Sequence, residues 1–159
     1  NNFYKDKVII VTGASSGIGL ASATRFASLG AKIVLAARSI DKLEKIAEEI
    51  NKKFNKSTDN VLCVKTDVTK EEDCKNLVEQ TVKHFGKIDV LVNNAGISMR
   101  AVFKDMDLNV MRSLMDTNFW GTVYCTKYAL PYLLESKGSV VGVISTAGYV
   151  DGWTMGING

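Results

Sequence analysis

The sequence feature that most constrains the fold of this chain is a glycine-rich turn between an apolar run and a helix-like segment. The apolar run at residues 8–11 is typical of a buried strand, and residues 20–27 have the pattern of a helix. Between them stand three glycines in the spacing G-x-x-x-G-x-G, at Gly13, Gly17 and Gly19. Free N–H groups at the start of a helix point toward an anion, and the helix dipole favours negative charge there. The segment therefore predicts a site for a phosphate-bearing nucleotide.

Composition narrows the kinds of protein that the chain can be. At 159 residues, of which 46% are hydrophobic, it has the size of one domain with a core. The net charge of +3 is small and the basic residues are scattered, so we expect no nucleic-acid partner. We interpret the lysines on the expected helix faces as solvated charges: Lys42, Lys45, Lys52 and Lys53. No apolar run approaches the roughly 18 residues that span a bilayer, so we expect no membrane segment in this chain.

The three cysteines are far apart in the sequence. Cys63, Cys74 and Cys125 are odd in number and form no C-x-x-C pair. This spacing predicts neither a disulfide framework nor a metal site, and we expect the cysteines to pack as small hydrophobic residues. Because cysteines stay unpaired in a reducing compartment, the sequence predicts a cytoplasmic location.

Strand-like and helix-like segments alternate along the chain. Strands are predicted at residues 8–11, 32–36, 61–64, 88–92 and 139–144, and helices at 17–29, 41–54, 69–85 and 108–134. Gly30 is expected to end the first helix, Thr69 to cap the third in a capping box with Glu72, and Pro131 to kink or end the last. This alternation predicts an α/β fold, a Rossmann-type doubly wound parallel sheet. In such sheets the ligand binds beyond the carboxyl ends of the strands.

Several motifs follow those strand ends, and together they resemble the short-chain dehydrogenase/reductase family over the whole chain. Residues 93–96 read N-N-A-G, residues 66–68 read T-D-V, and Asn118 lies in the segment D-T-N-F-W-G. Residues 138–148 are similar to the family's fifth strand, which ends at a catalytic serine, here Ser145. The resemblance implies the strand order 3-2-1-4-5 and a nicotinamide cofactor. The cofactor-binding residues that it implies are Gly13, Ser15, Ser16, Gly17, Ile18, Gly19, Arg38, Ser39, Asp67, Val68, Asn94, Ala95 and Gly96.

The choice of cofactor depends on the residues after the second strand. Family members that bind NAD carry an acid there, whereas this chain has Ala37, Arg38 and Ser39. A guanidinium binds a phosphate through paired, charge-assisted hydrogen bonds. We therefore predict NADP, with NAD less favoured. In the competing interpretation Arg38 is an ordinary solvated charge.

The remaining site residues each have a structural alternative. The resemblance implies that Ser145 orients the reacting oxygen of the substrate; alternatively, Ser145 is an ordinary serine at the end of a strand. It implies that Asn118 takes part in a proton relay; alternatively, Asn118 only forms a buried hydrogen bond. With Thr69 capping the helix, Asp67 is free to accept from the adenine amine, but it could be only a turn residue. Asn93 and Asn94 are expected to tie neighbouring strands together, or else to form a polar turn.

The family's acid–base pair, Y-x-x-x-K, does not occur in this sequence. From Ser145 its place falls at or just past Gly159, and Tyr149 has no lysine four residues later. We expect residues 1–159 to be one dinucleotide-binding domain that is incomplete at its C-terminus, with the fifth strand left as an apolar edge. The alternative is a natural short form without the acid–base pair.

The sequence thus predicts an enzyme, an NADP(H)-dependent oxidoreductase that moves a hydride between nicotinamide and a small carbonyl or secondary alcohol substrate. The alternative is a non-catalytic nucleotide-binding protein of the same fold, a sensor or scaffold. The helix at 108–134 carries more large apolar residues than one face can bury, which predicts a homodimer or homotetramer: Met111, Leu114, Met115, Phe119, Trp120, Tyr124, Tyr128 and Leu133.

Overall fold

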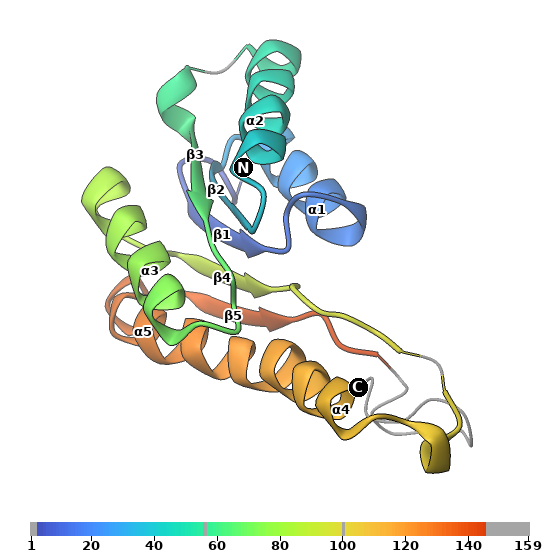
Figure 1. Ribbon diagram of the computed structural model, residues 1–159. Helices are drawn as coiled ribbons and strands as arrows, with labels where there is room; N and C mark the ends of the chain where they lie inside the picture. Colours follow the sequence, from blue (N-terminus) through green and yellow to red (C-terminus); the bar gives the residue numbers. More distant parts are fainter. Residues whose placement is uncertain (1–2, 56, 100, 146–159) are drawn as a thin grey trace.

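A computed structural model describes residues 3–55, 57–99 and 101–145 of the chain. Its centre is a parallel sheet of five strands in the order β3-β2-β1-β4-β5 (Figure 1), which confirms the predicted fold class and strand order. The strands are β1 (Val8–Thr12), β2 (Lys32–Ala37), β3 (Val61–Lys65), β4 (Val90–Asn93) and β5 (Ser139–Gly142). The helices are α1 (Gly17–Ser28), α2 (Ile40–Phe54), α3 (Glu71–Phe85), α4 (Leu108–Met115) and α5 (Gly121–Ser136). Short helical turns form η1 (Thr58–Asn60), η2 (Phe103–Asp105) and η3 (Asp116–Trp120).

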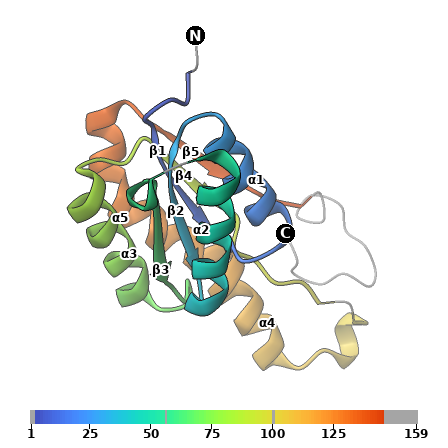
Figure 2. The same cartoon turned by 90° about the horizontal axis from the view of Figure 1, so that it is seen from above.

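Helices cover both faces of the sheet. Helices α1 and α2 pack on one face, and α3 and α5 pack on the other (Figure 2). Strand β1 serves both layers, because Ile9 and Val11 belong to the first core and Val8 and Ile10 to the second. Successive side chains on a strand point to opposite faces, so a continuous apolar run is what a doubly covered strand requires.

The predicted helix at residues 108–134 is present, but it contains a π-helical turn. This turn, η3, lies between α4 and α5, and the Gly121 N–H reaches back to the Asp116 carbonyl, while the backbone at both ends of η3 stays right-handed helical. Pro131 does not end α5, which continues to Ser136. The predicted end of α1 is confirmed, since Gly30 has φ +86° and its N–H bonds the Ala27 carbonyl.

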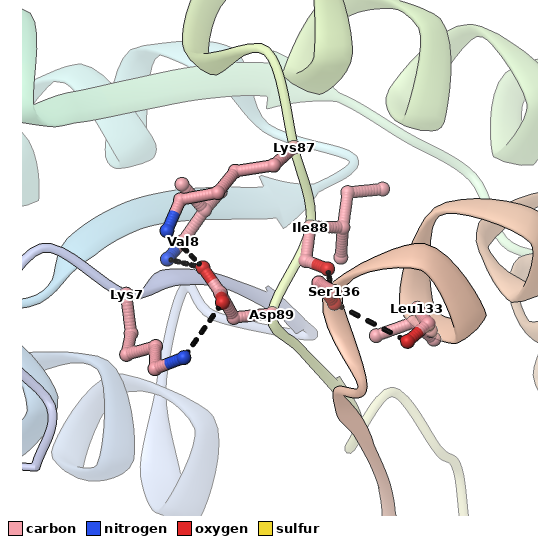
Figure 3. Close-up of polar contacts among 7 residues, drawn as sticks. All are labelled: Lys7, Val8, Lys87, Ile88, Asp89, Leu133 and Ser136. Atoms are coloured by element: carbon pink, nitrogen blue, oxygen red, sulfur yellow. Dashed lines mark hydrogen bonds and ion pairs between the residues drawn. The ribbon is translucent and has the colours of Figure 1, made fainter.

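A buried carboxylate joins β1 and β4 at the amino end of the sheet. Asp89 precedes β4 and its side chain is only 4% exposed. It accepts hydrogen bonds of 2.9 Å from the Lys7 ammonium and from the Val8 N–H, and it forms an ion pair of 2.9 Å with Lys87 (Figure 3). Burial raises the pKa of this carboxyl, but the bonds from Lys87, Val8 and Lys7 outweigh burial and hold the pKa below its ordinary value.

Strand β5 pairs with β4 and is the last strand of the sheet within the described residues. All four of its residues are exposed, including Val140 and Val141. In the described ranges, none of the helices is both long enough and apolar enough to cross a bilayer.

Candidate functional site

A cleft of about 610 Å³ opens at the carboxyl ends of the strands. Its lining comes from the loops after β1, β2, β3 and β4 and from the segment where α4 meets η3. Ten predicted cofactor-binding residues line it: Gly13, Ser15, Ser16, Arg38, Ser39, Asp67, Val68, Asn94, Ala95 and Gly96. The remaining three, Gly17, Ile18 and Gly19, form the first turn of α1 next to this lining. The structure therefore brings the separate sequence motifs to one place.

The glycine-rich turn leaves its outer side open. Gly13 has φ +64°, and a Cβ built there would lie 2.9 Å from the Ala95 Cα, so no larger residue fits. Gly17 also has a positive φ, +55°, but a Cβ there would meet no described atom within 4 Å. Among the described residues, the Ser16 hydroxyl makes no capping hydrogen bond to α1. The first turn of α1 thus has no side-chain cap from Ser16, and it begins directly after two residues that line the cleft, Ser15 and Ser16.

Thr12 joins this turn to the loop after β4. Its Oγ1 accepts hydrogen bonds of 3.0 Å from the N–H groups of both Asn94 and Ala95, and it lies 3.4 Å from the Val92 carbonyl to which it donates. The Asn94 amide completes the joint by donating to the Thr12 carbonyl at 2.9 Å. Sequence reasoning did not single out Thr12; the signal was a hydroxyl at the end of a wholly apolar strand.

The two asparagines after β4 act on different neighbours. Asn94 ties β4 to β1, as expected, whereas the Asn93 side chain donates to Thr126 Oγ1 on α5 at 3.0 Å. Asn93 therefore anchors the strand to a helix rather than to another strand.

The prediction that Thr69 caps α3 is wrong. The helix begins at Glu71 with Lys70 as its N-cap, and Asp73 reaches back to accept from the Asp67 N–H at 2.9 Å. The Asp67 Oδ1 accepts from the N–H of Thr69 at 3.1 Å and from its hydroxyl at 2.8 Å. One oxygen of Asp67 is thus engaged in an Asx turn, so this residue is not wholly free for an adenine amine, although it lines the cleft.

Two cations face the cleft beyond β2. Arg38 follows β2 and Lys42 lies in the first turn of α2, and both line the cleft together with Ser39. In the described part of the chain, neither cation has a carboxylate within 4 Å or a side-chain hydrogen bond. The interpretation of Lys42 as a charge on the solvent face of α2 is incomplete, because its side chain also lines the cleft. Its spacing of four residues from Arg38 could have suggested this.

Asn118 lies at the centre of η3 and holds the loop that follows β4. Its Oδ1 accepts from the Ile97 N–H and its Nδ2 donates to the Ile97 carbonyl, both at 2.9 Å. A Cβ built on Gly96 would come within 3.3 Å of that Oδ1. Asn118 thus adjoins the cleft lining without forming part of it.

Ser145 is exposed and lies three residues past the end of β5. The structure places it at the carboxyl side of the sheet but not among the residues that line the cleft. Residues 146–159, which include Tyr149, lie outside the described residues.

Comparison with known proteins gives matches along nearly the whole chain. The family model described as short chain dehydrogenase matches residues 7–157. A curated relative, 11-beta-hydroxysteroid dehydrogenase 1A of Arabidopsis thaliana, is 43% identical over 150 residues, which cover 94% of this chain and 42% of that protein. The chain thus spans less than half the length of this relative.

Solved structures of the same kind superpose closely. A short-chain dehydrogenase/reductase of unknown function from Caenorhabditis elegans, solved with cofactor, matches with a TM-score of 0.88 and 35% identity over 95% of this chain and 57% of that one. An alcohol dehydrogenase of the archaeon Thermococcus sibiricus, complexed with 5-hydroxy-NADP, matches with a TM-score of 0.87 and 29% identity over 94% of this chain and 63% of that one. With the strand order, the glycine turn and the family match in agreement, the chain belongs to the short-chain dehydrogenase/reductase family.

Proposed function

We propose that the protein is an NADP(H)-dependent oxidoreductase that interconverts a secondary alcohol and a carbonyl compound. One observation carries the proposal: the glycine-rich loop that leads into α1 lines the same cleft as Arg38, which has no ion-pair partner within the described residues. A helix start suits a diphosphate and a guanidinium suits a further phosphate. NADP carries both groups on one molecule.

The geometry of the cleft supports a cofactor of this kind. At Gly17 the open side that a Cβ would enter holds no described atom within 4 Å, which leaves room for a diphosphate to approach the backbone. The volume of about 610 Å³ lies within the usual range for small-molecule sites. Gly13, Ser15, Ser16 and the first turn of α1 would hold the diphosphate.

The choice of NADP over NAD is supported by charge. The loop after β2 presents Arg38 and no acid to the cleft, and a carboxylate there would repel a 2′-phosphate. The Thermococcus neighbour was solved with 5-hydroxy-NADP, which is consistent with a phosphate subsite in this fold.

We propose hydride transfer as the reaction because the chain belongs to the short-chain dehydrogenase/reductase family. When bound, the nicotinamide supplies or takes up the hydride. The Ser145 hydroxyl would hydrogen-bond the reacting oxygen of the substrate, and Asn118, through its hold on the Ile97 backbone, would keep the loop beside the cofactor in place. The name of the Arabidopsis relative refers to a hydroxysteroid, and we propose a secondary alcohol or its ketone as the substrate class.

Assembly and location are also proposed. Phe119 and Trp120 of η3 are 49% and 43% exposed, and Leu134 of α5 is exposed as well, which supports a homodimer or homotetramer. The cysteines are free, with Cys74 and Cys125 buried, which suits a reducing compartment such as the cytoplasm.

Cofactor titration of the full-length protein tests the proposal. Calorimetry should show NADP(H) binding more tightly than NAD(H), and Arg38→Ala should weaken NADP(H) by about tenfold or more while NAD(H) changes little. Equal losses for both cofactors would reject the 2′-phosphate assignment. Binding without turnover of any alcohol or ketone would favour the non-catalytic alternative, and no binding of either cofactor would reject the proposed function altogether.

A second variant tests the reaction itself. Ser145→Ala should lower turnover while the affinity for NADP(H) stays close to normal, because Ser145 lies outside the cleft lining. Unchanged turnover would remove Ser145 from the mechanism.

A further inference from the structure

Lys42 occupies an electrostatically unfavourable position. It is the third residue of α2, which begins at Ile40. The positive end of the helix dipole lies at this terminus, where a cation is repelled and an anion is attracted. Arg38, four residues earlier, adds a second positive charge on the same side of the cleft. A solvated lysine is less favourable at this terminus than further along the helix.

No carboxylate of the described chain relieves this charge. The ion pairs there involve Lys7, Lys87, Lys104 and Lys127, but neither Arg38 nor Lys42. Asp41 is adjacent in sequence, yet it lies beyond the 4 Å of an ion pair with either cation. Both cations therefore remain available to an anion from outside.

The residue between them is available too. Ser39 is the N-cap of α2, but its hydroxyl makes no capping hydrogen bond within the part of the chain that the structure describes, and it lines the cleft beside Arg38. An uncapped first turn leaves N–H groups that a ligand anion can satisfy. Arg38, the Ser39 hydroxyl and Lys42 thus offer two charges and one neutral donor on one wall of the cleft.

We propose that Lys42 is a second specificity-determining residue for the 2′-phosphate of the cofactor, acting with Arg38 and Ser39. This inference rests on the proposed function, which names NADP(H) as the cofactor. Lys42 would bind as a point charge on a flexible stem, while Arg38 would supply the planar, paired contacts.

Binding of cofactor fragments tests this role without any need for turnover. In the full-length protein, Lys42→Ala should weaken NADP⁺ and 2′,5′-ADP by about two- to fivefold, the range of an exposed ion pair, and leave NAD⁺ and 5′-ADP unchanged. Lys42→Glu should weaken the 2′-phosphate ligands further, and Lys42→Arg should largely restore them.

Lys45→Ala is the matched control. Lys45 lies one turn further along α2, is exposed and carries the same charge, but it does not line the cleft. Its removal should leave the affinity for all four ligands within about twofold, because a solvated charge outside the cleft is screened. Equal effects of Lys42→Ala and Lys45→Ala would overturn the proposal, since only the general positive field would then matter.

The outcomes separate this inference from the function on which it rests. If Arg38→Ala abolishes the preference for NADP⁺ while Lys42→Ala has no effect, Lys42 is excluded and the proposed function stands. If the wild-type protein binds NAD⁺ as tightly as NADP⁺, the choice of cofactor and the role of Lys42 both fail.

Discussion

The two ends of the parallel sheet hold their charges in opposite ways. At the amino end, Lys7 and Lys87 converge on the buried carboxylate of Asp89. At the carboxyl end, Arg38 and Lys42 line an open cleft and have no acidic partner within the described residues. Charged residues therefore stabilise the fold at the amino end of the sheet and remain available for a ligand at its carboxyl end.

This difference shows how to distinguish structural charges from functional ones in this chain. A charge that contributes to folding finds its partner within the chain and gives up water for it, as Asp89 does. A charge that serves binding stays unpaired until the ligand arrives, so it contributes little to the stability of the free protein. Burial and pairing, rather than residue type, separate the two classes.

The largest expected effect is at the amino end. Asp89→Ala should lower the free energy of unfolding by about 3 kcal/mol, because Lys7, Lys87 and the Val8 N–H lose a buried acceptor. Urea denaturation of the full-length protein measures it. Asp105→Ala is the control: Asp105 lies 3.7 Å from Lys104 in an exposed pair and should cost less than about 0.5 kcal/mol. Similar losses for both variants would mean that the burial of Asp89 does not matter.

The same carboxylate sets a pH dependence. Its pKa is lowered in the folded state, so its contribution is fully present above the unfolded value, which is about 3.9, and is lost as the pH falls through the folded pKa. The stability difference between the wild type and Asp89→Ala should therefore stay constant from pH 7 to pH 5 and shrink below about pH 4. A difference that grows on acidification would contradict this assignment.

An intermediate effect distinguishes two glycines at the carboxyl end. Both Gly13 and Gly17 have a positive φ, but only at Gly13 would a Cβ press on the backbone, 2.9 Å from the Ala95 Cα. Gly13→Ala should therefore destabilise the protein by about 1–3 kcal/mol more than Gly17→Ala. Gly17→Ala should instead weaken NADP(H) binding, because its methyl group enters the space where the diphosphate approaches. Denaturation of both variants checks the expected stability difference, and calorimetry checks the expected loss of NADP(H) affinity. Normal affinity in Gly17→Ala would contradict the placement of the diphosphate beside Gly17.

The smallest effect compares one cation from each end. Lys7→Met should cost about 1 kcal/mol of unfolding free energy, because it removes a bond of 2.9 Å to a buried acid. Arg38→Met should change the stability of the cofactor-free protein by less than about 0.5 kcal/mol, because it removes no partner. Thermal unfolding without cofactor measures both. An equal loss for Arg38→Met would show that its charge is already satisfied within the protein.

Local sequence patterns predicted the sheet well and the polar contacts less well. The strands are apolar runs bounded by glycine or polar residues, and both features are visible in a short window of sequence. The π-helical turn contains Asn118, whose side chain bonds the backbone of Ile97, and no helical period in the sequence reveals this contact across 21 residues. The predicted start of α3 was wrong for a related reason, because the Asp67 carboxylate accepts from both the N–H and the hydroxyl of Thr69 in a turn that precedes the helix. The spacing of four residues between Arg38 and Lys42 is visible in the sequence, but which side of α2 borders the cleft follows only from the packed structure.

The hydroxyl of Thr12 has a consequence for how the cleft meets its ligand. One oxygen atom fastens the backbone of Asn94 and Ala95 to the end of β1, so the loops after β1 and β4 are held together before any nucleotide arrives. Binding then has little backbone freedom to remove from these loops, and more of the contact free energy appears as affinity. A valine at this position would keep the shape of the strand but would release that joint.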